Sequence, residues 1–208
     1  MIDLEKLAGH KGSAFGNLGL PAQPSQEMFE NLLAAELKLI GDRWQVTEKI
    51  NALSSDNHHL SSCIWLEDES QRIGEVNIPT VFFQQMRTKK VFFVNIPFEE
   101  RLDFIVKHYG KFEKDKLVNA IIRIKKRLGG LETKTAINYL IEDNIKDCFA
   151  VLLNYYDKHY LKSLQNRDNF SALFTKLELT TVEEGKNADT ILETASVQQK
   201  KLSANKND

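Results

Sequence analysis

The sequence lacks several features that mark large classes of proteins. Its 208 residues include only two cysteines, Cys63 and Cys148, which form neither a CxxC pair nor part of a metal-ligand cluster. No apolar run approaches the roughly 18–20 residues that a membrane span needs. Residues 1–5 do not begin a signal peptide, because no basic segment precedes an apolar core. These absences predict a soluble protein of the reducing cytoplasm.

The motifs of self-contained nucleotide-binding and hydrolytic enzymes are also missing. Lysine follows glycine only at residues 110–111 and 185–186, and neither lysine precedes Ser or Thr, so the sequence contains no GxxxxGK[ST] loop. GxGxxG, HExxH and GxSxG do not occur either. The formal charge of −1, from 28 basic and 29 acidic residues, excludes a histone-like binder that depends on bulk positive charge. A local basic patch is still compatible with this balance.

Glycine and proline are absent from residues 131–184, whereas the first half alternates short apolar runs with turn signals. The composition, 42% hydrophobic and 27% charged, is that of one globular domain. We expect strands at residues 1–7, 63–66, 91–94 and 173–179. Because buried strands alternate with helical segments, the pattern predicts an α/β fold with a parallel sheet and a helical C-terminal half.

The helical segments are amphipathic. A helix is expected after Pro24 and Ser25, and the following helices at residues 98–109, 117–128, 133–145 and 147–164. On the first helix one face carries Phe29, Leu32, Leu33, Leu37 and Ile40. Residues 41–62 are interpreted as a surface connection, and residues 183–208 as a polar, disordered tail that follows a domain of residues 1–182.

A glycine-rich stretch at residues 9–19 is a candidate phosphate site. Backbone amides freed by glycine, together with a lysine and a hydroxyl, can surround a phosphate. The candidate ligands and loop residues are His10, Lys11, Gly12, Ser13 and Gly16. The alternative is a flexible surface loop between a strand and a helix.

An acidic triplet, Glu67, Asp68 and Glu69, follows the predicted strand at residues 63–66. Carboxylates at the carboxyl end of a parallel strand lie where α/β folds bind ligands and could hold Mg²⁺. Alternation sends Glu67 and Glu69 to one side, and Arg72 is close enough in sequence to pair with one of them. A solvated strand end explains the same residues.

A basic stretch follows at residues 111–127, where seven basic and two acidic residues give a net charge of +5. The basic side chains lie on the polar side of an amphipathic helix and could contact nucleic-acid phosphates, although a solvated face is the alternative. The candidates are Lys114, Lys116, Arg123, Lys125, Lys126 and Arg127. Cys63 and Cys148 are each expected to be buried small hydrophobes. His58 and His59 lack a third ligand, so no metal site is predicted.

Several segments together resemble one family, the tRNA 2-selenouridine synthases. The resemblance covers roughly residues 1–180. It lies in residues 2–5, 7–8, 10–13, 15–16, 18–19, 26, 29–33, 65–70, 72–74, 100–101, 155–157 and 160. The matches within residues 2–19 and within residues 65–74 are together quite specific, because no generic α/β pattern requires them.

This resemblance implies a P-loop NTPase-like domain that is incomplete at its N-terminus. In the family a rhodanese-like domain with a reactive cysteine and a Walker A loop would precede Met1, and neither Cys63 nor Cys148 matches that cysteine. The implied reaction converts wobble 2-thiouridine of tRNA to 2-selenouridine with selenophosphate, through transfer of a geranyl group from geranyl diphosphate to the sulfur. The implied partners are tRNA and the missing rhodanese-like region, but neither DNA nor a membrane.

Two further interpretations remain open at the level of sequence. The chain could be a non-catalytic tRNA-binding or interaction module. It could also be a relative of small-molecule P-loop kinases, because residues 91–101 resemble their strand-to-helix step, although the missing GKT or GKS lysine argues against this.

Overall fold

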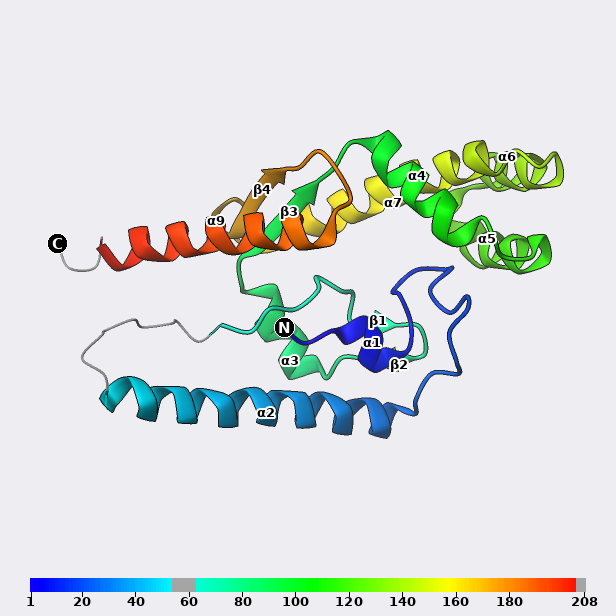
Figure 1. Ribbon diagram of the computed structural model, residues 1–208. Helices are drawn as coiled ribbons and strands as arrows, with labels where there is room; N and C mark the ends of the chain where they lie inside the picture. The colour runs from blue at the N-terminus through cyan, green and yellow to red at the C-terminus, as the bar shows by residue number, and fades with distance from the viewer. Residues whose placement is uncertain (54–62, 205–208) are drawn as a thin grey trace. The chain divides into compact units, whose positions relative to one another are not determined.

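The computed structural model describes residues 1–53 and 63–204, and the chain divides into two compact units, Met1–Arg87 and Thr88–Asp208 (Figure 1). His58 and His59 lie outside the described residues. Within the described residues, no helix is long and apolar enough to cross a membrane.

The first residues form a short helix where the sequence predicted a strand. Ile2 makes an isolated parallel β-bridge with Leu66, and its N–H donates to the Trp65 carbonyl at 2.9 Å. Asp3 then starts helix α1 (Leu4–Ala8) by accepting a hydrogen bond from the Lys6 N–H at 2.7 Å. The predicted strand at residues 1–7 is therefore wrong beyond Ile2, because the capping carboxylate of Asp3 ends the extended backbone.

The segment at residues 63–66 is extended but is only a marginal strand. Leu66 alone is bridged, and the side chains of residues 64–66 are half-buried. Cys63 is exposed, so the prediction that it is a buried hydrophobe is wrong. The single bridge lies at the far end of the segment, which leaves its beginning open to solvent.

Helix α2 (Gln26–Leu53) confirms the predicted helix and extends well beyond it. Phe29 and Leu33 are buried, but Leu32 is 39% exposed and does not share their face. The interpretation of residues 41–53 as a surface connection is wrong. This stretch contains no proline, and its single glycine, Gly41, is tolerated within a helix at a modest cost.

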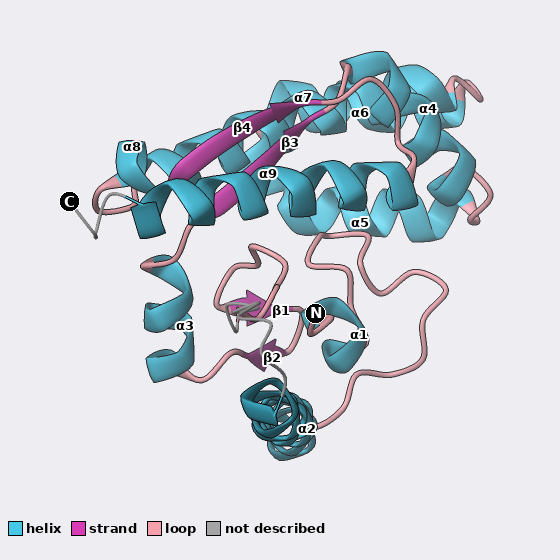
Figure 2. Cartoon of the chain, turned by 60° about the vertical axis from the view of Figure 1, so that its left-hand side comes forward, coloured by secondary structure: helices cyan, strands magenta, loops and turns pink. Residues whose placement is uncertain are grey.

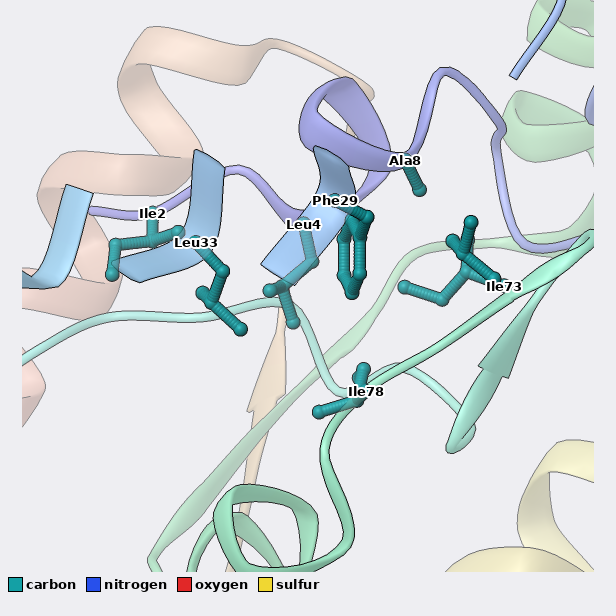
Figure 3. Close-up of a cluster of buried hydrophobic side chains, with 8 residues drawn as sticks. Ile2, Leu4, Ala8, Phe29, Leu33, Ile73 and Ile78 are labelled. Atoms are coloured by element: carbon teal, nitrogen blue, oxygen red, sulfur yellow. The ribbon is translucent and has the colours of Figure 1, made fainter. Parts of the chain in front are cut away.

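A small hairpin that the sequence analysis did not predict completes the first unit. Strands β1 (Arg72–Ile73) and β2 (Val76–Asn77) pair antiparallel, and helix α3 (Thr80–Arg87) follows. The core of this unit gathers side chains from the N-terminus, α2 and the hairpin (Figure 3). Its buried members are Ile2, Leu4, Ala8, Phe29, Leu33, Ile73, Val76 and Ile78.

The second unit is built on a pair of parallel strands, β3 (Val91–Asn95) and β4 (Phe174–Glu178) (Figure 2). Their register runs from Val91 opposite Phe174 to Asn95 opposite Glu178. Both strands were predicted, and the parallel pairing between strands far apart in sequence confirms the α/β class.

Helices make up most of the second unit, as the absence of glycine and proline predicted. They are α4 (Phe98–Tyr109), α5 (Lys114–Leu128), α6 (Gly130–Ile141), α7 (Ile145–Gln165), α8 (Phe170–Leu173) and α9 (Glu184–Ala204). Helix α5 packs on α6, α6 on α7, and α4 on α7. The inward residues Leu102, Leu117 and Ile121 are all buried, as their spacing predicted.

Helix α9 corrects the prediction of a disordered tail. Residues 184–204 are helical, and Gln198 connects this helix to the strands. The Gln198 side chain accepts from Lys90 Nζ at 3.1 Å and donates to Thr175 Oγ1 at 3.1 Å. Polar composition suggested disorder, but the segment contains no proline and includes good helix formers such as Ala, Glu, Gln and Lys.

Candidate functional site

The glycine-rich loop begins at a defined helix end. Gly9 adopts a left-handed conformation, φ +61°, at the C-terminus of α1. The Gly9 N–H donates to the Lys6 carbonyl at 3.1 Å and the His10 N–H to the Glu5 carbonyl at 3.0 Å. This Schellman-type ending fixes the direction in which the loop leaves the helix.

The loop is closed by its own hydrogen bonds. The Lys11 N–H donates to the Gly16 carbonyl at 3.0 Å, and the Gly16 N–H returns a bond to the Ser13 carbonyl at 2.9 Å. The Phe15 N–H donates to Ser13 Oγ at 3.2 Å, and the Phe15 ring is buried. These three amides are therefore occupied within the loop. Among the side chains that could contact an anion here, Lys11 is exposed and Ser13 is half-buried.

His10 lies beneath the loop rather than on its surface, since only 8% of the residue is exposed. A Cβ on Gly16 would lie 2.6 Å from His10 Cε1, and a Cβ on Gly74 would lie 2.7 Å from His10 Cδ2. The imidazole thus packs against two glycines, one from the loop and one from the β1–β2 turn. Its position supports the loop and is too enclosed for a direct substrate ligand.

The acidic segment meets this loop. Glu67 accepts a hydrogen bond from the Leu4 N–H at 2.8 Å. The Glu69 carboxylate packs against Gly12, where a Cβ would lie 2.7 Å from Oε1, and it also forms a side-chain hydrogen bond with Glu5. Glu67 and Glu69 therefore both reach the α1–loop region, as alternation along the segment predicted.

The carboxyls of Glu5 and Glu69 form a pair that holds a proton near neutral pH. Burial raises the pKa of Glu69 to about 7, and the neighbouring charge of Glu5 acts in the same direction. Burial also raises the pKa of Glu5 and of Glu67. Two carboxyl groups can share a hydrogen bond only when one of them is protonated. The segment is thus a proton-sharing contact between α1 and residues 67–69.

Arg72 does not join this contact. It is exposed, and its Nε donates to the Gly74 carbonyl at 2.8 Å. No ion pair joins Arg72 to residues 67–69, all of which the structure describes. Among all the residues that the structure describes, no group of three or more His, Cys, Asp or Glu side chains could hold a metal. Glu67, Asp68 and Glu69 thus do not form such a group.

Two glutamines that the sequence analysis did not assign to the site bind its parts together. Gln23 Nε2 donates to the carbonyls of Ala8 at 2.8 Å and Ile73 at 3.1 Å, and its Oε1 accepts from the Glu75 N–H at 2.9 Å. Gln26 exchanges two 2.8 Å hydrogen bonds with the backbone of Asn77. The Gln23 side chain makes hydrogen bonds to backbone groups, as a neighbouring strand would. Such bonds leave no periodic pattern in the sequence, so composition and spacing could not identify Gln23.

A separate basic surface lies on α5. Leu117 and Ile121 face inward, and the basic residues near the C-terminal end of the helix are displayed to solvent. They are Arg123, Lys125, Lys126 and Arg127. This arrangement concentrates positive charge in less than two turns of helix.

The two lysines at the start of α5 have acidic partners. Lys114 pairs with Asp143 at 2.6 Å, and Lys116 pairs with Glu113 at 2.9 Å. Their charge is locally neutralised, so the basic surface is shorter than the sequence predicted and is centred on the second half of α5.

Cys148 does not have the setting of a nucleophile. Cys148 is buried, as predicted, and burial raises the pKa of its thiol to about 12. The thiolate is therefore negligible at neutral pH.

The parallel strand pair and the helical second half fit a P-loop-like α/β domain. The chain belongs to the family described as the tRNA 2-selenouridine synthase AAA domain, whose model matches residues 1–184. No solved structure matches the chain.

Curated relatives carry the same family name. The tRNA 2-selenouridine synthase of Nitrosomonas eutropha is 29% identical over an alignment of 213 positions, gaps included, which covers 80% of this chain and 50% of that protein. The synthase of Bdellovibrio bacteriovorus is 31% identical over an alignment of 205 positions, gaps included, which also covers 80% of this chain and 50% of that protein. The synthase of Nitrosomonas europaea is 37% identical over 109 residues, which cover 52% of this chain and 24% of that protein. The chain thus spans about half the length of the first two relatives.

Proposed function

We propose that this chain is the P-loop-like domain of a tRNA-modifying transferase that converts wobble 2-thiouridine to 2-selenouridine. In this proposal selenophosphate supplies the selenium, and a geranyl group from geranyl diphosphate is first transferred to the sulfur. The observation that carries the proposal is the family match over residues 1–184. That range includes the glycine-rich loop, the acidic segment and the basic helix.

The glycine-rich loop is the proposed site for the phosphate groups of these substrates. Lys11 is exposed, and Ser13 is held two residues away in a loop whose backbone is fixed by hydrogen bonds. An ammonium and a hydroxyl on a fixed backbone suit a diphosphate or a selenophosphate, because charged hydrogen bonds to phosphate are strong and directional. His10 and Gly16 are assigned supporting roles in this site.

The protonated state of the Glu5–Glu69 pair limits the repulsion that a phosphate group would meet at this loop. A fully ionised pair beside Gly12 would repel an anion at the loop. A pair that retains one proton near pH 7 carries less negative charge. The repulsion of a phosphate group at the loop is then weaker than with both carboxyls ionised, and one negative charge of the pair remains.

The basic surface of α5 is the proposed contact with tRNA. Its four displayed cations lie within one short stretch, and phosphate contacts of this kind position RNA without reading its sequence. The choice of the wobble base must therefore depend on other residues. The rhodanese-like region of the full-length family members, with its cysteine, is proposed as the partner that completes the transfer.

A non-catalytic tRNA-binding module is the second candidate. It is favoured by one observation, the exposed basic residues at positions 123 and 125–127 of α5, which need no catalytic group to bind RNA phosphates. In this case the chain would bind tRNA but would leave both transfer steps to another protein.

A chimaera separates the two candidates. The matched region of the Nitrosomonas eutropha synthase is replaced by this chain, and modified nucleosides of the product tRNA are identified by mass spectrometry. Formation of 2-selenouridine supports the transferase. A folded chimaera that binds tRNA but forms neither the geranylated nor the selenated nucleoside supports the module. A folded chimaera without tRNA binding contradicts both.

A further inference from the structure

A cluster of aromatic rings lies on the outer part of α7, outside the site described above. Tyr155 and His159 are one helical turn apart, and their ring centroids are 4.4 Å apart at an interplanar angle of 54°. Tyr156 meets Tyr155 edge to face at 5.2 Å. Tyr155 is half-buried and His159 is exposed, so the pair presents ring surface to solvent.

Basic side chains surround this pair. Arg127, at the end of α5, is close enough for its charge to act on the Tyr155 phenol. Lys158 and Lys162 are exposed on α7, three residues after Tyr155 and His159 respectively. Residues three apart on a helix are neighbours on its surface. The rings therefore lie among three cations contributed by two helices.

The acidic residue nearest in sequence does not cancel this charge. Asp157 accepts two hydrogen bonds from the Arg101 guanidinium, at 2.7 and 2.9 Å. This pair also holds α7 against α4, and Leu152 and Leu153 of α7 are buried. The helix that carries the rings is thus fixed on its inner side.

The Tyr155 hydroxyl remains a neutral donor. Burial raises the pKa of this phenol above its ordinary value, and the positive charge of Arg127 opposes the rise. A neutral, partly enclosed phenol offers an aromatic face and one hydrogen-bond donor, both of which suit a nucleobase.

Aromatic faces among cations are the chemistry that recognises unpaired RNA. Unstacked bases pack on tyrosine and histidine rings, while lysine and arginine contact the adjoining phosphates. A duplex hides its base faces within the stack and could use only the cations. A protein partner would be favoured by a wide apolar surface, whereas these rings are bordered by charge.

We propose that Tyr155 and His159, flanked by Arg127, form a stacking site for an unpaired base of a single-stranded RNA segment. The inference rests on the proposed function, since the anticodon loop of tRNA supplies such a base. It assigns to α7 a role distinct from the phosphate contacts proposed for α5. In this arrangement α7 holds RNA bases by stacking, and α5 holds the RNA phosphate backbone by charge.

The experiment compares a seven-nucleotide single-stranded RNA carrying 2-aminopurine with a duplex of the same sequence, using the full 208-residue chain. Tyr155→Phe, which loses only the hydroxyl donor, should keep most of the affinity for the single strand. Tyr155→Leu, which keeps apolar volume without a stacking face, should weaken it by roughly 5- to 100-fold. His159→Ala should weaken it in the same direction. Leu161→Ala, a change at a 44% exposed position of the same helix, is the control and should have no effect.

The readouts distinguish stacking from other causes. The 2-aminopurine fluorescence should change on binding and lose that change in Tyr155→Leu, while duplex affinity and the salt dependence of binding stay the same. Equal losses in Tyr155→Phe and Tyr155→Leu, or equal losses for duplex and single strand, overturn the stacking site. If tRNA still binds in that case, the proposed function survives. If the unaltered chain binds neither tRNA nor the single strand, tRNA binding by the chain and the stacking site are both contradicted, and a protein partner for this surface becomes the next hypothesis.

Discussion

Arg101 and Asp157 form a two-pronged ion pair that connects α4 to α7. Nη1 lies 2.7 Å from Oδ1 and Nη2 lies 2.9 Å from Oδ2. The Arg101 Nε also donates to the Ile96 carbonyl at 3.0 Å, so the guanidinium joins the end of β3 to both helices. Both residues belong to the blocks that carry the family resemblance, and the structure gives them a supporting role in the fold.

We predict that Asp157→Ala destabilises the chain by about 1–2 kcal/mol. The substitution leaves a partly buried guanidinium without its carboxylate, and the partial exposure of both side chains, 30% and 35%, limits the cost. Urea denaturation of the two proteins measures the difference. Lys146→Ala is the matched control, because Lys146 pairs with Asp103 at 2.7 Å on the surface. An equal shift of both midpoints would contradict the special role of Arg101 and Asp157.

Glycine substitutions should have opposite effects at two positions. Gly16→Ala places a Cβ 2.6 Å from His10 Cε1 and 2.9 Å from the Lys11 nitrogen, and we expect it to destabilise the chain by about 1–3 kcal/mol. Gly41→Ala meets nothing within 4 Å in the middle of α2. It should stabilise the chain by about 0.5–1 kcal/mol, since alanine is the better helix former. Thermal unfolding followed by circular dichroism tests both, and a neutral Gly16→Ala would show that the packing of His10 is not required.

Periodic patterns predicted the second unit well and the first unit poorly. The helices of residues 98–165 follow from apolar spacing, because each buries one continuous face. The first unit depends on contacts without a period, such as the cap at Asp3, the two glutamines and a hairpin with strands of two residues each. Local hydrogen bonds decide such structure, and a pattern of apolar residues does not encode them.

The candidate site was predicted in part. The glycine-rich loop and the acidic segment were singled out separately, and the fold brings them into contact through Gly12 and Glu69. Their contact could not be foreseen, because it depends on how α1 turns at Gly9. The burial of His10 was also unforeseen, because a histidine that precedes a lysine and a glycine is expected to be exposed to solvent.

The stability of the chain should fall as the pH rises through the range that Glu69 titrates. Its carboxyl ionises near pH 4.5 when unfolded and near 7 when folded, so the folded state binds more protons between these values. By linkage, the stability contributed by the protonated form is complete below about pH 4.5 and is lost as the pH approaches and passes 7. Glu69→Gln, which keeps the hydrogen bond without the charge, should therefore stabilise the chain at pH 8 by up to about 3 kcal/mol.

Urea denaturation at pH 5 and pH 8 measures this effect as a difference between variant and parent, so that other titrating groups cancel. Glu75→Gln, a change at an exposed glutamate of the same unit, is the control and should leave the pH dependence unchanged. Parallel pH profiles for Glu69→Gln and its parent would show that Glu5 and Glu69 do not share a proton.

Lys11→Ala should weaken the binding of geranyl diphosphate and of selenophosphate by about 10- to 100-fold, the value of one charged hydrogen bond. Calorimetry on the chimaera described above measures both ligands. Lys6→Ala is the control, because Lys6 is an exposed lysine of α1 that is not assigned to the phosphate site. The affinity of this variant for the two ligands should match that of the parent. Unchanged affinities in Lys11→Ala would remove the loop from the phosphate site.

Charge reversal on α5 tests the contact with tRNA. We expect Arg123→Glu with Lys126→Glu to weaken tRNA binding by at least about 10-fold and to reduce the slope of log affinity against log salt by roughly one to two, because fewer counterions are released. Lys114→Glu with Lys116→Glu changes the net charge by the same amount. It should have a smaller effect, because Asp143 and Glu113 already neutralise these lysines.

Filter binding across a series of salt concentrations measures the affinity for tRNA and its salt dependence. If the two double variants behave alike, overall charge explains the result. If neither changes affinity or slope, the basic surface is only solvated, and tRNA must bind elsewhere.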